Sequence, residues 1–114
     1  MTIPKDISII KTLEDLREFH GEASSGVKAK IQHKLDGHAK NFLARSPFLI
    51  LATNNETGSD ASPLGDAPGF IKILDDATVL MPEHPGNRLA DSLTNIVANP
   101  MMGMIHFIPG MDET

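Results

Sequence analysis

The chain has 114 residues, a mass of 12.3 kDa and a formal net charge of −5 at pH 7. This length suffices for one compact domain and is too short for two. The negative charge disfavours binding to nucleic acid or to an anionic membrane surface. The absence of cysteine excludes disulfides, thiolate metal sites and cysteine nucleophiles. Because no signal-peptide pattern or membrane-spanning stretch is visible either, we expect a cytoplasmic protein.

The first part of the chain, residues 1–45, is predicted to be helical. Thr12 can cap a helix that runs to His20, with Asp15 three positions after the cap and Gly21 as the stop. From residue 25 to residue 45, apolar residues recur at spacings of three and four, which predicts a second helix of about five turns. This stripe consists of Val27, Ile31, Leu35, Ala39, Phe42 and Leu43.

The second part, residues 46–114, alternates short apolar runs with turn residues. Strands are predicted over residues 48–53, 59–64, 70–74, 78–81 and 101–108. A further helix is predicted over residues 88–97, between the last two strands. Most of these connections are too short for helical crossovers and therefore indicate antiparallel pairing. The pattern predicts one α+β domain, with a small barrel or strongly curled sheet preceded by helices.

The five histidines do not form a metal site. His33 and His38 are five residues apart, so on a helix their side chains diverge by about 140°. His106 lies between two apolar residues of a predicted strand, where a hydrogen-bonded structural role is favoured. The sequence predicts no metal ligands.

Two segments could bind a ligand. Pro85-Gly86-Asn87-Arg88 joins a strand end to a helix start, where backbone N–H groups and an arginine can hold a phosphate. Asn87 as an ordinary helix cap is the alternative. The prolines and glycines of the segment from Ser62 to Phe70 could let a flat ligand approach the main chain, or could simply form a wide connection.

The order of the motifs resembles the FMN-binding split-barrel family related to pyridoxamine 5′-phosphate oxidase, over about residues 13–110. The residues that carry the resemblance are Ser46-Pro47-Phe48-Leu49-Ile50-Leu51-Ala52-Thr53, Ala61-Ser62-Pro63-Leu64-Gly65-Asp66-Ala67-Pro68-Gly69-Phe70, Leu74-Asp75-Asp76, Met81-Pro82-Glu83-His84-Pro85-Gly86-Asn87-Arg88, Asp91-Ser92-Leu93-Thr94-Asn95-Ile96 and Asn99-Pro100.

The resemblance implies a Greek-key antiparallel split β-barrel that forms a homodimer, with FMN in clefts between the subunits. By motif, Gly86, Asn87 and Arg88 would hold the FMN phosphate. The flavin would lie beside the predicted strand over residues 59–64 and near the end of the neighbouring strand over residues 78–81. The residues implied there are Ser62, Pro63, Gly65, Asp66, Met81 and Pro82.

The chain departs from the family pattern in two ways. Leu64 stands where similar proteins commonly carry a basic residue, and an aliphatic side chain cannot pair with a phosphate or a flavin carbonyl. We therefore expect weakened FMN binding. Relatives also continue with more strands, so either this chain is a truncated relative or those strands come from another chain. We expect a barrel that is incomplete at its C-terminal end, with a free strand edge along residues 101–108.

The leading functional hypothesis is an FMN-dependent oxidoreductase that acts on a small-molecule substrate or electron donor. No residue is assigned as catalytic. A non-catalytic flavin-binding or flavin-sensing protein is the alternative. A third hypothesis is an assembly module without cofactor, which binds partners through an exposed sheet edge.

Overall fold

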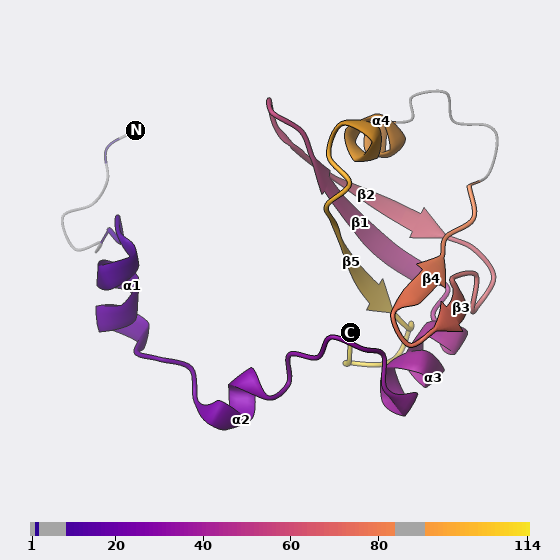
Figure 1. The fold of residues 1–114 in the computed structure, drawn as a ribbon, viewed down its shortest axis with the longest axis horizontal. Coiled ribbons are helices and arrows are strands. Elements are labelled where there is room, and N and C mark those ends of the chain that lie inside the picture. Colours follow the sequence, from indigo (N-terminus) through magenta and orange to yellow (C-terminus); the bar gives the residue numbers. More distant parts are fainter. Residues whose placement is uncertain (1, 3–8, 84–90) are drawn as a thin grey trace. The chain divides into compact units, whose positions relative to one another are not determined.

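The computed structural model describes residues 2, 9–83 and 91–114. The chain forms two compact units, Met1–Gln32 and His33–Thr114, which are described separately (Figure 1). The first contains two short helices, and the second contains two further helices and all the described strands. The second unit also contains every motif on which the functional hypotheses rest.

The N-terminal unit has helices but no buried side chain among its described residues. Helix α1 (Leu13–His20) begins after Thr12, whose hydroxyl accepts a hydrogen bond from the Asp15 backbone N–H at 3.0 Å. It ends at Gly21, where φ is +71°. The predicted cap and stop are therefore confirmed. Helix α2 (Ser25–Lys28) is a single turn, and neither helix contains a buried residue.

The single helix predicted over residues 25–45 is wrong. After α2 the chain leaves helical geometry, and a new helix, α3 (Gly37–Arg45), begins behind Asp36. The Asp36 carboxylate accepts the Ala39 backbone N–H at 2.8 Å and so caps the new helix. Asp36 and Gly37 form a helix start because an aspartate side chain favours capping over a place in the middle of a helix. The apolar periodicity continues across this break and therefore does not reveal it.

A three-stranded antiparallel sheet forms the centre of the second unit. Its strands are β1 (Phe48–Asn54), β2 (Ser59–Gly65) and β5 (Met102–Phe107), in the order β2-β1-β5. The predicted hairpin between the first two is confirmed, and the Asn55 side chain accepts two backbone N–H groups of its turn at 2.8 and 3.0 Å. Strands β2 and β5 are the edges of this sheet.

A second antiparallel pair follows β2 along the chain. It consists of β3 (Lys72–Asp75) and β4 (Thr78–Leu80). Asp75 accepts the Ala77 backbone N–H at 2.8 Å, and this bond, with a smaller contribution from the Thr78 hydroxyl, lowers the pKa of the Asp75 carboxyl. The predicted hairpin is confirmed, with its turn one residue later than expected, at residues 76–77.

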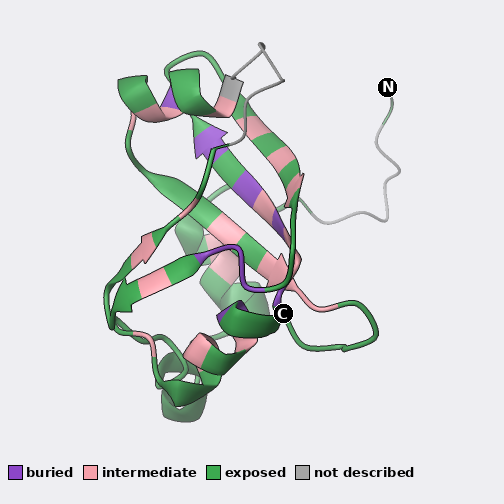
Figure 2. Cartoon of the chain, turned by 90° about the vertical axis from the view of Figure 1, so that its right-hand side faces the viewer, coloured by how far each residue is buried: buried purple, intermediate pink, exposed green. Residues whose placement is uncertain are grey.

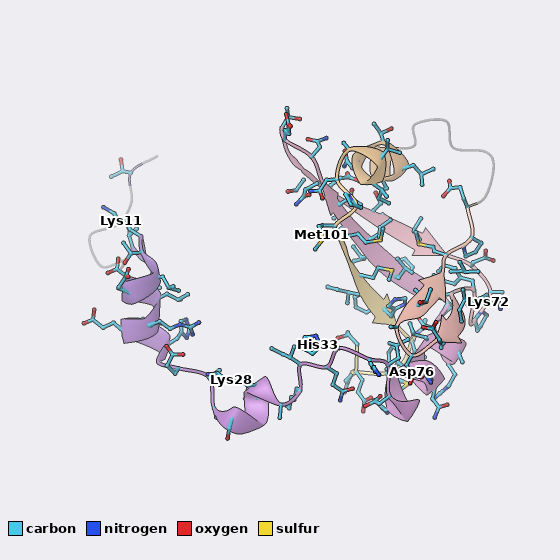
Figure 3. The ribbon with its side chains drawn as sticks, in the orientation of Figure 1. Lys11, Lys28, His33, Lys72, Asp76 and Met101 are labelled. Carbon is cyan, nitrogen blue, oxygen red and sulfur yellow. The ribbon has the colours of Figure 1, made fainter. Side chains whose placement is uncertain are left out.

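Contacts with this hairpin hold α3 in place. The Leu35 backbone N–H donates to the Asp76 carbonyl at 2.7 Å, and Lys40 forms an ion pair with the Asp76 carboxylate. The Lys72 ammonium donates to the Gly69 carbonyl at 2.8 Å. Figure 3 labels Asp76 and Lys72, which lie near α3 and the β3–β4 pair. The start of α3 and the second sheet therefore form one connected structure.

The core lies on one face of the central sheet. Helix α4 (Asp91–Ala98) packs on β1 and β2 over this face. Figure 2 shows the buried residues concentrated in β1 and in the segment that precedes β3. The buried apolar cluster comprises Leu49, Leu51, Phe70 and Ile71, and the partly buried residues packed against it are Leu64, Val79, Met81, Ile96 and Met104.

The fold class agrees with the prediction of an α+β protein with antiparallel sheets. In the described part of the chain, the strands form one sheet of three and one of two, and these sheets do not close into a barrel. No helix in the described residues is long and apolar enough to cross a membrane.

Candidate functional site

The two faces of β2 separate the residues that the sequence assigns to the flavin. Burial alternates along the strand, with Asp60, Ser62 and Leu64 half-buried and the residues between them exposed. Successive side chains of a strand point to opposite faces. Ser62 and Leu64 therefore lie on the face that carries α4 and the core, whereas Pro63 and Gly65 lie on the opposite face.

The Ser62 hydroxyl is already engaged within the protein. It donates to the Asp60 carboxylate at 2.7 Å, and the Ser92 hydroxyl of α4 lies 3.1 Å from the Ser62 hydroxyl oxygen and 3.4 Å from the same carboxylate. We call these three residues the Asp60 cluster. Because the cluster uses the Ser62 side chain, what Ser62 offers a ligand is its main chain.

The sequence predicted a role for Ser62 but for neither of its partners. Asp60 and Ser62 are two residues apart on a strand, so their shared face could have been inferred from strand periodicity. Ser92 lies in one of the motifs that carry the family resemblance, but its position in the sequence does not indicate contact with β2. Its role follows from the packing of α4 on the sheet.

Leu64 contributes to the core. Its side chain packs against the buried cluster that contains Leu49 and Leu51, and the register places it directly opposite Leu49. The position at which a basic residue was expected therefore faces apolar side chains. An aliphatic residue suits this place because burying it removes apolar surface from water.

The loop after β2 is held against the junction of α3 and β1. The Asp66 backbone N–H donates to the Pro47 carbonyl at 3.0 Å, and the Gly69 backbone N–H donates to the Ser46 carbonyl at 3.1 Å. Gly69 has φ of +76°, and a Cβ there would lie 2.6 Å from the Ala44 carbonyl oxygen. Gly69 is thus required by packing. At this residue the segment is a structural connection, as the alternative to ligand binding predicts.

Gly65 differs from Gly69. It is exposed, and a Cβ at this position would meet its nearest neighbour at an ordinary 3.6 Å. Strand β2 is also an edge strand, which in the described residues pairs with β1 alone. A flat ligand could therefore approach the main chain near Pro63 and Gly65, since an edge strand has N–H and C=O groups that no neighbouring strand uses.

The segment that follows β4 is described in part. Met81 is half-buried against the core cluster, and Pro82 is exposed. The predicted phosphate-binding residues Gly86, Asn87 and Arg88 lie outside the described residues. Both described flanks of residues 84–90 adjoin the same face of the sheet, because Met81 packs on its core and Ser92 contacts Ser62.

A buried asparagine anchors the second half of α4. The Asn95 side chain is 7% exposed, donates to the Thr53 hydroxyl at 3.0 Å and accepts from the Asn55 amide at 2.7 Å. Asn99 adds a bond from its amide to the Asn54 side-chain oxygen. Asn95 belongs to one of the family motifs, but the sequence does not indicate that it holds α4 on the β1–β2 hairpin.

The described histidines differ in burial. His106 lies opposite Leu49 on the core side of β5, its Nδ1 is buried without a partner, and burial lowers its pKa. His38 is exposed and lies 3.3 Å from the Glu113 carboxylate. Within residues 2, 9–83 and 91–114, no three histidine or acidic side chains gather where they could hold a metal ion.

Comparison with known proteins identifies the class to which this fold and these motifs belong. The family model described as pyridoxamine 5′-phosphate oxidase matches residues 35–109, well over half of the 114-residue chain. The chain therefore belongs to the pyridoxamine 5′-phosphate oxidase family. The match covers α3, all the described strands and α4. No curated protein and no solved structure gives a match to the chain.

Proposed function

We propose that this chain binds FMN and acts as a flavin-dependent oxidoreductase on a small-molecule substrate or electron donor in the cytoplasm. The observation that carries the proposal is the contact between Ser62 of β2 and Ser92 of α4. It joins the strand proposed to line the flavin to the helix that follows the segment proposed to bind phosphate. Both elements lie inside the residues that match the family.

The flavin ring would lie along the edge of β2 that pairs with no other described strand. Main-chain groups from Ser62 to Asp66 would bond the polar edge of the ring, and the exposed Gly65 would allow close approach. Pro63 suits an edge strand because it has no N–H to leave unpaired. Met81 and Pro82 would approach from the neighbouring segment. Bound FMN would supply hydride transfer, while the chain orients it and limits access of water.

The FMN phosphate would be held by Gly86, Asn87 and Arg88. This part of the proposal rests on the sequence and on family membership. Backbone N–H groups together with a guanidinium suit a phosphate dianion, and Arg88 can bind two of its oxygens at once. In a chain with a net charge of −5, a local cation is needed to attract an anionic ligand.

We further propose that the chain forms a homodimer with the flavin at the interface, and that the strands belong to a split barrel of the family type. The face of the sheet opposite α4 carries Ile50 on β1, flanked in register by Pro63 and Ile105. Ile105 is 52% exposed. A second copy that covers this apolar face would remove it from water.

A flavin titration tests the proposal directly. The purified chain should bind FMN, with a flavin absorbance band retained after dialysis. Arg88→Ala should weaken FMN binding about ten- to a hundredfold, because a charge-assisted bond contributes about 1.5–3 kcal/mol, and should leave riboflavin binding almost unchanged. Arg45→Ala, at the exposed end of α3, is the matched control. Equal weakening of both flavins would reject the phosphate assignment.

Leu64→Arg tests the departure from the family pattern. The residue lies on the face of β2 that α4 covers, which the described flanks of the proposed phosphate segment also adjoin, so a basic side chain there should tighten FMN binding and slow its loss on dialysis. The same substitution removes an apolar side chain from the core, so the variant should also be less stable than wild type. Leu64→Met preserves the apolar contact and is the control for stability. Unchanged FMN affinity in folded Leu64→Arg would show that Leu64 does not limit binding.

A non-catalytic flavin-binding or flavin-sensing protein is the second candidate. It is favoured by one observation: the Ser62 hydroxyl is bonded to Asp60 on the face that α4 covers, so it offers the flavin no proton-transfer group. Oxidation of a reduced nicotinamide by the flavin-loaded chain separates the two candidates. A chain that retains FMN and does not turn over the donor would support the second.

A further inference from the structure

Asp60 is a polar residue on β2 to which neither the motifs nor the family match gives a role. Its carboxylate accepts the Ser62 hydroxyl at 2.7 Å, with the Ser92 hydroxyl 3.4 Å away. The residue is half-buried, on the face that α4 covers. A half-buried carboxylate is costly unless hydrogen bonds satisfy it, and here two hydroxyl groups from different elements surround it.

We propose that Asp60 is a positioning residue that fixes the beginning of α4 against β2. The inference rests on the proposed FMN function. In the described residues, polar side chains attach α4 and the residue after it to the hairpin at Ser92, Asn95 and Asn99. Because Asn95 and Asn99 lie in or beyond the second half of the helix, the Ser92 attachment is the one that fixes its beginning. The Asp60 cluster is the attachment closer to the segment proposed to bind phosphate.

The spacing of the two proposed subsites depends on this attachment. FMN must reach the ring subsite along β2 and the phosphate subsite before α4 at the same time, so its affinity gains from a fixed distance between them. Riboflavin lacks the phosphate and needs only the ring subsite. Loss of the Asp60 cluster should therefore lower FMN affinity towards that of riboflavin and leave riboflavin affinity nearly unchanged.

Simple electrostatics predicts the opposite sign. Removal of a negative charge near an anionic ligand should tighten FMN binding. Asp60→Ala thus separates a positioning role from a charge effect, because FMN binding weakens only if the beginning of α4 loses its fixed position. Glu56→Ala removes the same charge from the exposed turn of the hairpin and is the matched control. Asp60→Asn keeps an oxygen that can accept a hydroxyl and should retain most of the preference for FMN.

The experiment is a fluorescence titration of each full-length variant with FMN and with riboflavin. The ratio of the two affinities should fall about tenfold in Asp60→Ala and stay near the wild-type value in Asp60→Asn and Glu56→Ala. Ser92→Ala should reproduce the fall, and the double variant should add little to it, because both changes break one cluster. If Asp60→Ala does not fold, Ser92→Ala alone tests the inference.

The outcomes separate this inference from the function on which it rests. A wild-type chain that binds no flavin would overturn the proposed function and the inference with it, and one that binds both flavins equally would overturn the phosphate assignment on which the inference depends. A wild-type chain that prefers FMN, with the same or a greater preference in Asp60→Ala and Ser92→Ala, would overturn only the positioning role. A fall in the ratio with unchanged riboflavin affinity would support it.

Discussion

Both units of the chain carry an apolar pattern, but among the described residues the apolar side chains are buried only in the second unit. In α1, Leu13 and Phe19 are 63% and 70% exposed, whereas in β1, Leu49 and Leu51 are 0% and 2% exposed. Both patterns have the spacing of the element that they form. The difference is that β1 lies between two strands and beneath α4, while α1 has no buried residue. Periodicity thus predicts an element, and burial requires other elements around it.

The largest effect should come from truncation in β1. Leu49→Ala is expected to lower the free energy of unfolding by about 2–5 kcal/mol, because it removes buried methyl groups and leaves a cavity. Leu13→Ala is the matched change in α1 and should alter it by less than about 0.5 kcal/mol. Denaturant titration of both variants measures the difference. Comparable losses would mean that α1 is part of the same cooperative core.

Two glycines with positive φ give a second test of the comparison. Gly69→Ala should destabilise the second unit by about 2–4 kcal/mol, because it combines backbone strain with a Cβ placed 2.6 Å from the Ala44 carbonyl oxygen. Gly21 has a similar φ, but a Cβ there meets nothing within 4 Å. Gly21→Ala should disturb only the end of α1. Thermal unfolding should show a lower midpoint for the first variant alone.

Local signals were sufficient for the hairpin and for the first cap. The apolar run in β1, the Asn-rich turn and the returning strand are contiguous, so turn chemistry and strand periodicity define them. The break before α3 was missed although Asp36 and Gly37 are a recognisable helix start. The apolar spacing continues on both sides of this start, so periodicity alone does not show that one helix ends and another begins.

The candidate site was predictable in its residues and not in their orientation. Motif order located the β2 segment, the segment after β4 and the start of α4. Which face of β2 meets the core depends on where α4 packs, and α4 lies about 30 residues further along the chain. The engagement of the Ser62 hydroxyl by Asp60, and the contact of Leu64 with the core, follow from that long-range packing.

A smaller effect should separate the half-buried His106 from an exposed histidine. Burial lowers the pKa of His106 below its ordinary value of 6.5, so as the pH falls below about 6.5 the unfolded chain takes up a proton before the folded chain does. Unfolding then becomes easier as acid is added. His106→Met should reduce the loss of stability between pH 7 and pH 5, because its side chain does not titrate. His20→Gln, in exposed α1, should leave the loss unchanged. Denaturant midpoints measured across this pH range provide the test, and identical pH profiles for wild type and His106→Met would show that the unpartnered Nδ1 does not control acid stability.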